Sequence, residues 1–252
     1  KRESTGVVDA ITAEDIGKFP DTNLAESLQR ITGVSIDRSN NEGSRITVRG
    51  FGPEFNLVTL NGRQMPTNNG RSFDFANLAT ESVSGVQVHK TARADVPSGG
   101  IGATVNISTA RPLDNPGLKA AVGAKAVYDT ANESGDDFTP ELSAIFSNTF
   151  ADDKFGILIS GSVQERKNRA EGMAVDNWIP NVDLSNSPNL QLTDNNQRAD
   201  GNTWYPQNAG YEILDNDRKR TNGQIVLQFA PTDKFKATLD YTYAKQELED
   251  RK

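Results

Sequence analysis

Few residues in this chain have the types and spacing that chemistry requires. Gly99, Gly100 and Gly102 lie close together, as in loops that cradle phosphate, but no Lys-Ser or Lys-Thr pair follows them. A backbone turn packed close to its neighbours is the favoured interpretation. His89 is the only histidine and cysteine is absent, so a zinc site is not expected. Turn chemistry explains the acidic pair Asp152-Asp153 better than general acid or base catalysis does. We therefore expect no enzyme activity, no metal and no cofactor.

The most informative polar side chains lie in residues 45–63, RITVRGFGPEFNLVTLNGR. Two short runs of alternating apolar and polar residues flank a loop with Gly and Pro, and the dipeptide Asn61-Gly62 follows the second run. Asn-Gly is the strongest short hairpin signal, so these runs are expected to form a β-hairpin. Arg49 ends the first run, and a guanidinium in such a position can hold a carboxylate through two charge-assisted hydrogen bonds.

The composition excludes some classes of protein. The net charge is -7, from 34 acidic and 27 basic residues, and no basic block occurs, which argues against a nucleic-acid partner. No run approaches the roughly 18 apolar residues of a membrane-spanning helix. A transmembrane β-strand needs only about 9–11 residues that are apolar on one face, so a membrane stays possible.

The elements that position these residues fall into two parts. After a short tail, residues 1–6, the part 7–112 mixes short helices and strands and reads as a small α+β domain. Thr12 and Asp15 form a capping box for a first helix. A second helix begins after Asp21 or Thr22, runs to about Ile31 and stops before Gly33, and a third, short one is expected near 75–80. Strands are expected at 34–37, 45–49, 57–60, 83–89 and 103–109.

Residues 113–252 contain five segments that alternate between apolar and polar residues, at 118–129, 138–150, 155–166, 222–229 and 235–243. Such strands fit a sandwich in water, whose apolar faces pack on each other, or a barrel wall in lipid with a polar lumen. Tight turns at 151–153 and 231–233, against longer connections at 130–137 and about 167–221, favour the barrel, with the last connection as a long extracellular loop.

Three segments in this order resemble the opening of a TonB-dependent outer-membrane receptor. They are VVDAITAEDIGKFPDTNLAESLQRITGVSIDR (7–38), RITVRGFGPEFNLVTLNGRQM (45–65) and VSGVQVHKTARADVPSGGIGATVNISTARP (83–112). The resemblance implies an α+β plug domain, followed by antiparallel transmembrane β-barrel strands that form a partial barrel. A barrel of this family has about 22 strands, so 113–252 would supply about the first five.

The resemblance also implies partners and a location. The outer membrane of a Gram-negative bacterium would supply the surrounding lipid, and the TonB protein of the inner-membrane complex would supply the energy for import. No segment resembling the TonB-contacting box precedes Val7, so we expect it upstream of this chain.

The resemblance assigns roles to named residues. Arg49, with Arg45 and Lys90 as weaker candidates, would form a latch, meaning a contact between plug and barrel wall that energy input weakens. Lys90 departs from the family, in which this strand commonly ends in Arg-Gly-Pro, and it could act only as a point charge. The plug motif itself comprises Gly50, Asn61, Gly62, Gly99, Gly100 and Gly102.

The polar loops of the plug and the long loop are expected to contact a substrate. Amides beside aromatic rings suit the hydroxyls and faces of sugars, so an oligosaccharide is the expected cargo and a ferric siderophore is the alternative. A soluble secreted β protein that binds carbohydrate is the alternative of another class. The candidate contacts are Asn40, Asn41, Glu54, Phe55, Gln64, Asn68, Asn69, Arg71, Trp178, Trp204 and Tyr205.

Overall fold

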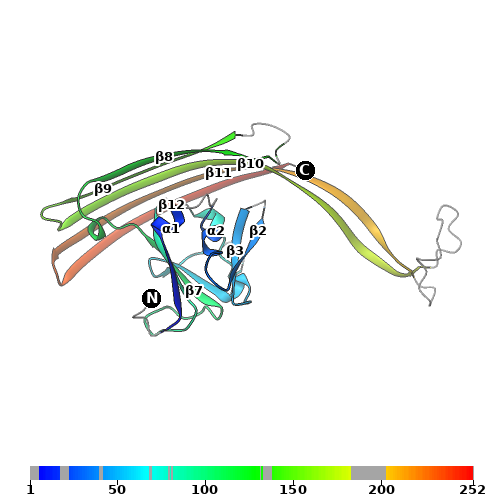
Figure 1. The fold of residues 1–252 in the computed structure, drawn as a ribbon, viewed down its shortest axis with the longest axis horizontal. Coiled ribbons are helices and arrows are strands. Elements are labelled where there is room, and N and C mark those ends of the chain that lie inside the picture. The colour runs from blue at the N-terminus through cyan, green and yellow to red at the C-terminus, as the bar shows by residue number, and fades with distance from the viewer. Residues whose placement is uncertain are drawn as a thin grey trace.

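The computed structural model describes residues 6–17, 23–39, 42–67, 70–78, 80, 82–130, 132, 138–182 and 203–251. They form two layers (Figure 1). A small α+β unit, the plug, lies beneath a curved sheet of long antiparallel strands, the wall. The plug comprises the described residues up to 112, and the wall comprises the strands that follow.

The plug is built around a five-stranded sheet with the order β1-β6-β7-β4-β5. Its neighbours are antiparallel except β4 and β7, which run parallel. The strands are β1 (Val8–Thr12), β4 (Asn56–Leu60), β5 (Arg63–Gln64), β6 (Val83–His89) and β7 (Ala103–Thr109). The sequence reasoning missed β1, because it assigned this segment only as the approach to the first helix.

The helices of the plug are short. Around α1 (Ala13–Gly17), the Asp15 carboxylate accepts from the backbone and hydroxyl of Thr12, whose hydroxyl accepts from the Asp15 amide, so the predicted capping box is confirmed. The second helix, α2 (Leu24–Leu28), is capped by Asn23 rather than by Asp21 or Thr22. Asn23 is favoured because its amide also donates to the Gly43 carbonyl at 2.6 Å, which ties the cap to the next strand pair.

The expected hairpin of residues 45–63 is wrong in its pairing. The first run belongs to β3 (Glu42–Val48), which pairs with β2 (Val34–Ser39) in a separate two-stranded sheet. After β3 the chain turns through positive φ at Arg49 and Gly50, passes the 3-10 turn η1 (Pro53–Phe55) and enters the main sheet as β4. The Asn61-Gly62 signal is sound, since both residues have positive φ and join β4 to β5 in a tight turn.

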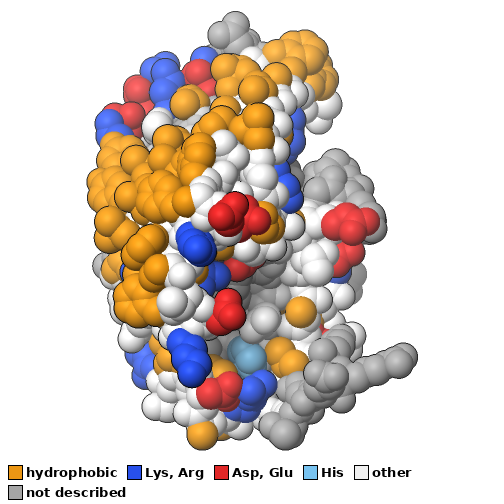
Figure 2. Space-filling model, turned by 90° about the vertical axis from the view of Figure 1, so that its left-hand side faces the viewer, with side chains coloured by type: hydrophobic (Ala, Val, Ile, Leu, Met, Phe, Trp, Pro, Cys, Tyr) orange, Lys and Arg blue, Asp and Glu red, His pale blue; other side chains and the backbone are white. Residues whose placement is uncertain are grey.

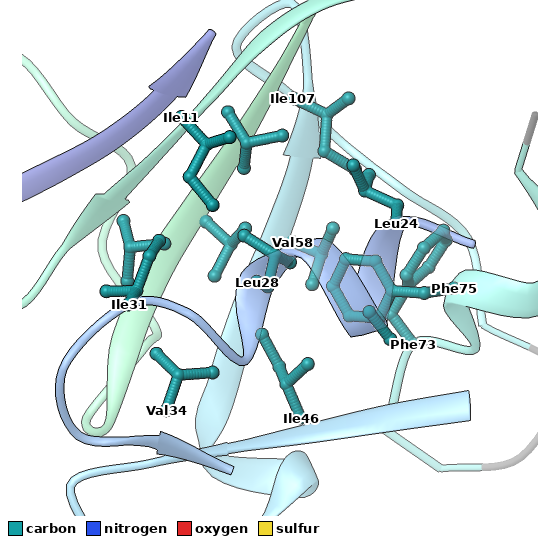
Figure 3. Close-up of a cluster of buried hydrophobic side chains, with 14 of the residues drawn as sticks. Ile11, Leu24, Leu28, Ile31, Val34, Ile46, Val58, Phe73, Phe75 and Ile107 are labelled. Carbon is teal, nitrogen blue, oxygen red and sulfur yellow. The ribbon is translucent and has the colours of Figure 1, made fainter. Parts of the chain in front are cut away.

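The core of the plug lies between the main sheet, α2 and the β2–β3 pair. Leu24 and Leu28 of α2 point toward Val58 and Ile107 of the sheet, with Ile46 of β3 beside them (Figure 3). Phe73 and Phe75 close one side of this cluster with their rings 5.0 Å apart, edge to face. Phe75 begins the 3-10 turn η2 (Phe75–Asn77), which is shorter than the helix expected at 75–80.

The wall follows the 3-10 turn η3 (Pro112–Asp114) and has the order β12-β11-β10-β9-β8, all antiparallel. The strands are β8 (Lys119–Tyr128), β9 (Phe138–Phe150), β10 (Phe155–Val182), β11 (Thr203–Thr232) and β12 (Phe235–Arg251). The alternation predicted from the sequence is present. Val122, Ile159 and Leu239 are exposed on the outer face, whereas Leu158 and Val226 are buried against the plug. Hydrophobic side chains accordingly gather over one flank of the molecule (Figure 2).

The expected loop of about 167–221 is mostly strand. Residues 167–182 of β10 pair with 203–217 of β11, and this two-stranded ribbon projects beyond the plug (Figure 1). Its period-two signal is short, because large hydrophobic residues alternate with others only at Met173 and Val175 and at Tyr211 and Ile213, although the backbone ladder continues. Among the described residues, no helix is both long and apolar enough to cross a membrane.

Candidate functional site: the plug–wall interface

A buried carboxylate of the plug is held by arginines of the wall. Glu42 begins β3, and its side chain is 8% exposed. Arg218 of β11 donates to both Glu42 oxygens, with Nη2 2.7 Å from Oε1 and Nη1 bonded to Oε2. Arg166 of β10 lies on the other side, with Nη1 3.3 Å from Oε1. The two-pronged contact with Arg218 is the strong form of a charge-assisted hydrogen bond.

The ladder of the wall explains why these arginines converge. Even-numbered residues of β10 and β11 point toward the plug, and Arg166 is directly opposite Arg218 in the register. Arg166 also donates to Glu141 of β9 at 2.7 Å, and Lys125 of β8 lies 3.4 Å from the same carboxylate. A continuous line of alternating charges therefore crosses the wall and ends at Glu42.

A second ionic contact has the opposite polarity. The buried Asp240 carboxylate of β12 accepts from Arg63 of the plug at 2.9 Å and lies 3.3 Å from Arg111. Arg63 is largely exposed and Arg111 is mostly buried, so Arg111 is the stronger partner. This contact between a plug arginine and a wall carboxylate is the kind of contact that the sequence analysis expected for the latch. The residues that form it are not the ones that the sequence analysis named.

Hydrogen bonds to the plug and to the η3 turn continue along β11. Arg220 donates to the carbonyls of Ala76 and Leu78 at η2, and Gln224 donates to the Thr109 hydroxyl at 2.9 Å. Further along, Gln228 accepts from the Leu113 amide at 3.0 Å. Inward side chains of this one strand therefore hold different segments of the plug and the η3 turn that follows it.

The residues proposed as the latch contact the plug itself. Arg49 donates to the Gly102 carbonyl at 2.7 Å and to that of Ile101 at 3.2 Å. Lys90 forms an ion pair with Asp9 at 2.7 Å. Arg45 is exposed and borders a cleft of about 660 Å³ between the plug and β12. Within the described residues, Arg49 and Lys90 thus join plug segments to one another, because the turn after β3 directs Arg49 to the glycine-rich turn.

The glycines of that turn are closely packed, as expected. A Cβ on Gly100 would lie 2.1 Å from the Ala103 carbonyl oxygen, and one on Gly102 would lie 2.5 Å from the Asn56 Oδ1. Gly99 has a φ of +130°, and its carbonyl accepts from Arg71 at 2.8 Å. The carbonyls of this turn are therefore bound to arginines.

His89 occupies the buried end of β6. Burial lowers the pKa of its imidazole, and the positive charge of Arg93 lowers this pKa further. No group of three or more His, Cys, Asp or Glu side chains that could hold a metal ion occurs among the described residues.

The substrate candidates are not gathered into one site. Phe55 stacks edge to face on Phe51 with the ring centres 6.1 Å apart, and Glu54 lies beside it, exposed like Gln64. Trp178 is 54% exposed on the projecting part of β10. Asn40, Asn41, Asn68 and Asn69 lie outside the described residues, as do the side chains of Trp204 and Tyr205.

Sequence reasoning missed Glu42, Arg218 and Asp240 as interface residues. Arg166 was placed on the polar face of its strand but was given no role. The sequence signal for Arg166 was its charge at an inward position of a wall strand, where the other inward residues are Ser and Gln. Such a charge needs a partner across the lumen.

Comparison with protein families matches residues 1–104 to the TonB-dependent Receptor Plug Domain. Residues 1–104 are the plug domain of a TonB-dependent receptor. The fold of the wall agrees with this, since it superposes together with the plug on solved structures that include the pyoverdine outer membrane receptor FpvA of Pseudomonas aeruginosa. The chain thus has the predicted fold, a plug followed by a partial barrel, and its place is the outer membrane of a Gram-negative bacterium.

Individual relatives give the extent of the likeness. The ferric enterobactin receptor PirA of Pseudomonas aeruginosa is 31% identical over 147 residues, which are 52% of this chain and 19% of that protein. The probable TonB-dependent siderophore receptor PirA of Acinetobacter baumannii is 28% identical over 125 residues, 43% of this chain and 16% of that protein. The chain therefore spans about a fifth of the length of these curated relatives.

Solved structures share the fold over nearly the whole chain. The siderophore receptor PirA from Acinetobacter baumannii superposes with a TM-score of 0.64 at 20% identity, covering 98% of this chain and 32% of that one. The copper transporter OprC gives a TM-score of 0.61 at 14% identity, covering 98% of this chain and 32% of that one. At these identities the likeness shows the fold alone.

Proposed function

We propose that the protein to which this chain belongs imports a scarce nutrient across the outer membrane, with energy supplied through TonB. The observation that carries the proposal is the plug–wall interface. Glu42 and Asp240 are buried carboxylates, each held by two arginines across the boundary between the two layers. Such contacts hold the plug firmly at rest, since leaving one partner buried and unpaired costs several kcal/mol.

The same contacts explain why transport needs energy. A plug held by buried ion pairs does not leave its seat spontaneously at a useful rate, so a pull from TonB supplies the work. Substrate binding promotes this step only if the seated and displaced plug bind the substrate differently. The protein makes no covalent change to its cargo, and the relatives named above are receptors and transporters rather than enzymes.

The outer face of the wall supports a position in lipid. Val122 is 86% exposed, and Phe146, Ile159, Ile225 and Leu239 are exposed with it on the same face. On β10 the apolar outward positions run from Phe155 to Val163, nine residues, which matches the length of a transmembrane strand. A soluble secreted β protein would bury this face, so the alternative of another class loses support.

The cargo that we propose is a ferric siderophore. The support is that the curated relatives are two ferric enterobactin receptors and a probable siderophore receptor. The comparisons thus favour what was the alternative from the sequence over an oligosaccharide. The exposed Trp178 on the projecting ribbon keeps an oligosaccharide as the second candidate, because an aromatic ring can stack on a sugar face.

An uptake experiment separates these cargoes. The full-length receptor is expressed in a Gram-negative host that lacks its own siderophore receptors, with and without a functional tonB gene. We expect TonB-dependent accumulation of iron-55 supplied as ferric enterobactin, and none of a labelled maltodextrin. Accumulation of the maltodextrin without iron uptake would show that the cargo is an oligosaccharide and not a ferric siderophore. Uptake of either cargo at the same rate without TonB would overturn the proposed mechanism.

A further inference from the structure

A small polar cavity adjoins the Glu42 ion pair. It has a volume of about 100 Å³ and is bordered by β3 and η2 of the plug and by β10, β11 and β12 of the wall. The side chains that matter here are Glu42, Asp74, Arg166, Asn216 and Arg218. A cavity of this volume accommodates a group the size of a carboxylate or a phosphate.

Several buried donors around this cavity have no acceptor. The Nε atoms of Arg166 and Arg218 and the Nδ2 of Asn216 donate no hydrogen bond, and two acceptors on the lining residues, Asn216 Oδ1 and Gln246 Oε1, receive none. Asn216 is 5% exposed and lies two residues from Arg218 on the same inward face of β11. The unpaired donors belong to residues that line this one cavity, and buried polar atoms are normally paired, so the cavity is a candidate site for a group that accepts hydrogen bonds.

The seated plug supplies a carboxylate to the buried arginines of the wall. Arg166 and Arg218 face two carboxylates, those of Glu42 and Glu141. Asp74 lies nearby, and its Oδ1 accepts from the Ala76 amide at 2.9 Å, so it caps η2. If the end of β3 moved away, Glu42 would leave with it, while Arg166 would keep Glu141. Arg218 would then stay buried without a carboxylate, which is strongly unfavourable.

We propose that Arg166, Arg218 and Asn216 form a binding site for a carboxylate- or phosphate-type anion, which Glu42 occupies while the plug is seated. An anionic group of the cargo takes the place of Glu42 as the plug shifts, so that Arg218 is never left unpaired. The identity of the cargo rests on the proposed import function. The existence of the anion site does not depend on that function. The two-pronged bond from Arg218 to Glu42 is the geometry with which arginine recognises such anions.

The first test replaces the internal carboxylate with a free one. In the full-length receptor, Glu42→Ala removes the carboxylate and leaves space for acetate. We expect the amides of β3 to exchange hydrogen at least tenfold faster than in the wild type. Acetate should reverse at least half of the increase in the logarithm of the exchange rate, whereas chloride at equal ionic strength should not. Glu42→Ser creates the same space with a polar side chain and serves if the alanine variant does not assemble.

Matched variants locate the effect. Arg218→Met combined with Glu42→Ala should abolish the acetate effect, because the binding group is gone. Asp114→Ala removes an exposed ion pair with Lys236 that also joins the η3 turn to the wall, and acetate should not alter its exchange. Equal effects of acetate and chloride on both Glu42 variants would overturn the site.

The second test concerns the source of the anion. Ferric citrate, a siderophore complex that carries free carboxylates, should bind the Glu42→Ala receptor at least fivefold more tightly than the wild type, because the competing carboxylate is absent. Unchanged or weaker binding would overturn the exchange with cargo. The acetate test uses no cargo, so it decides the anion site even if the uptake assay refutes siderophore import. Conversely, normal iron uptake without any acetate effect would refute only the site.

Discussion

Neutralising Glu42 without changing its shape should loosen the seated plug. In Glu42→Gln the side chain keeps its volume and can still accept one hydrogen bond, but Arg218 loses its carboxylate partner. The two side chains are 8% and 11% exposed, so solvent screens the pair poorly. Removing one partner of a buried pair costs about 3–5 kcal/mol. We expect about 3 kcal/mol, the lower end, because Arg166 keeps its bond to Glu141.

A loss of about 3 kcal/mol corresponds to roughly a hundredfold change in an equilibrium constant, at 1.4 kcal/mol for each factor of ten. Hydrogen exchange of β3 amides in the full-length receptor measures this opening. Glu42→Gln should accelerate exchange about a hundredfold, and Arg218→Met should act similarly. The double variant should lose far less plug stability than the sum of the two single losses, since no charge is left unpaired.

A control defines the scale. Asp114→Asn removes an ion pair whose side chains are 60% and 47% exposed, so exchange should change less than about fivefold. Exchange within threefold of the wild type in Glu42→Gln would show that the pair does not hold the plug. Strictly additive effects of the Glu42 and Arg218 variants would show that the two side chains act independently.

Three further predictions concern other parts of the plug. Gly100→Ala should cost about 2–3 kcal/mol of plug stability in thermal unfolding, because its Cβ would lie 2.1 Å from the Ala103 carbonyl oxygen; an unchanged midpoint would contradict the packing. Asp240→Asn should lower the free energy of plug opening, measured by hydrogen exchange, by about 2 kcal/mol. Replacing its exposed partner, Arg63→Ala, should lower it by under about 0.5 kcal/mol, and equal costs would refute this ranking. The lowered pKa of His89 means that the unfolded chain takes up the proton first, so plug stability should fall as pH drops below about 6.5, and His89→Gln should remove this dependence in unfolding at pH 7.5 and 5.5.

Local features of the fold could be predicted from the sequence where one short-range rule decides them. The capping box of Thr12 and Asp15 and the Asn61-Gly62 turn each depend on a few adjacent residues. The two faces of the wall strands follow from period-two alternation, which a strand in lipid cannot avoid.

Pairing partners could not be predicted in the same way. Alternation tells which side of a strand is buried and says nothing of the neighbour, so β3 and β4 were assigned to one hairpin although they lie in different sheets. The projecting ribbon of β10 and β11 was assigned as loop for a related reason. Outside the apolar band neither face must be hydrophobic, so the ladder leaves only a short pattern in the sequence.

The interface residues depend on alignment between two layers that are far apart in sequence. Glu42 and Arg218 are 176 positions apart, and their contact requires both the seating of the β2–β3 pair and the register of the wall. Arg49 has the right chemistry for a latch, but the turn after β3 directs it to the Gly102 carbonyl. Residue type therefore predicted an ion pair between plug and wall, but it did not predict which residues form the pair.

The order of contacts along β11 has a consequence for how the plug moves. Arg218 and Arg220 bind the plug with charged groups, whereas Gln224 binds it with a neutral amide and Gln228 binds the adjoining η3 turn in the same way. Water replaces an amide contact at little cost, because the net gain of a neutral hydrogen bond is only about 1 kcal/mol. A buried guanidinium cannot be released so easily. We therefore expect a displaced plug to separate first at Gln224 and last at Arg218 and Arg220, and an anion that replaces Glu42 would remove the restraint at Arg218.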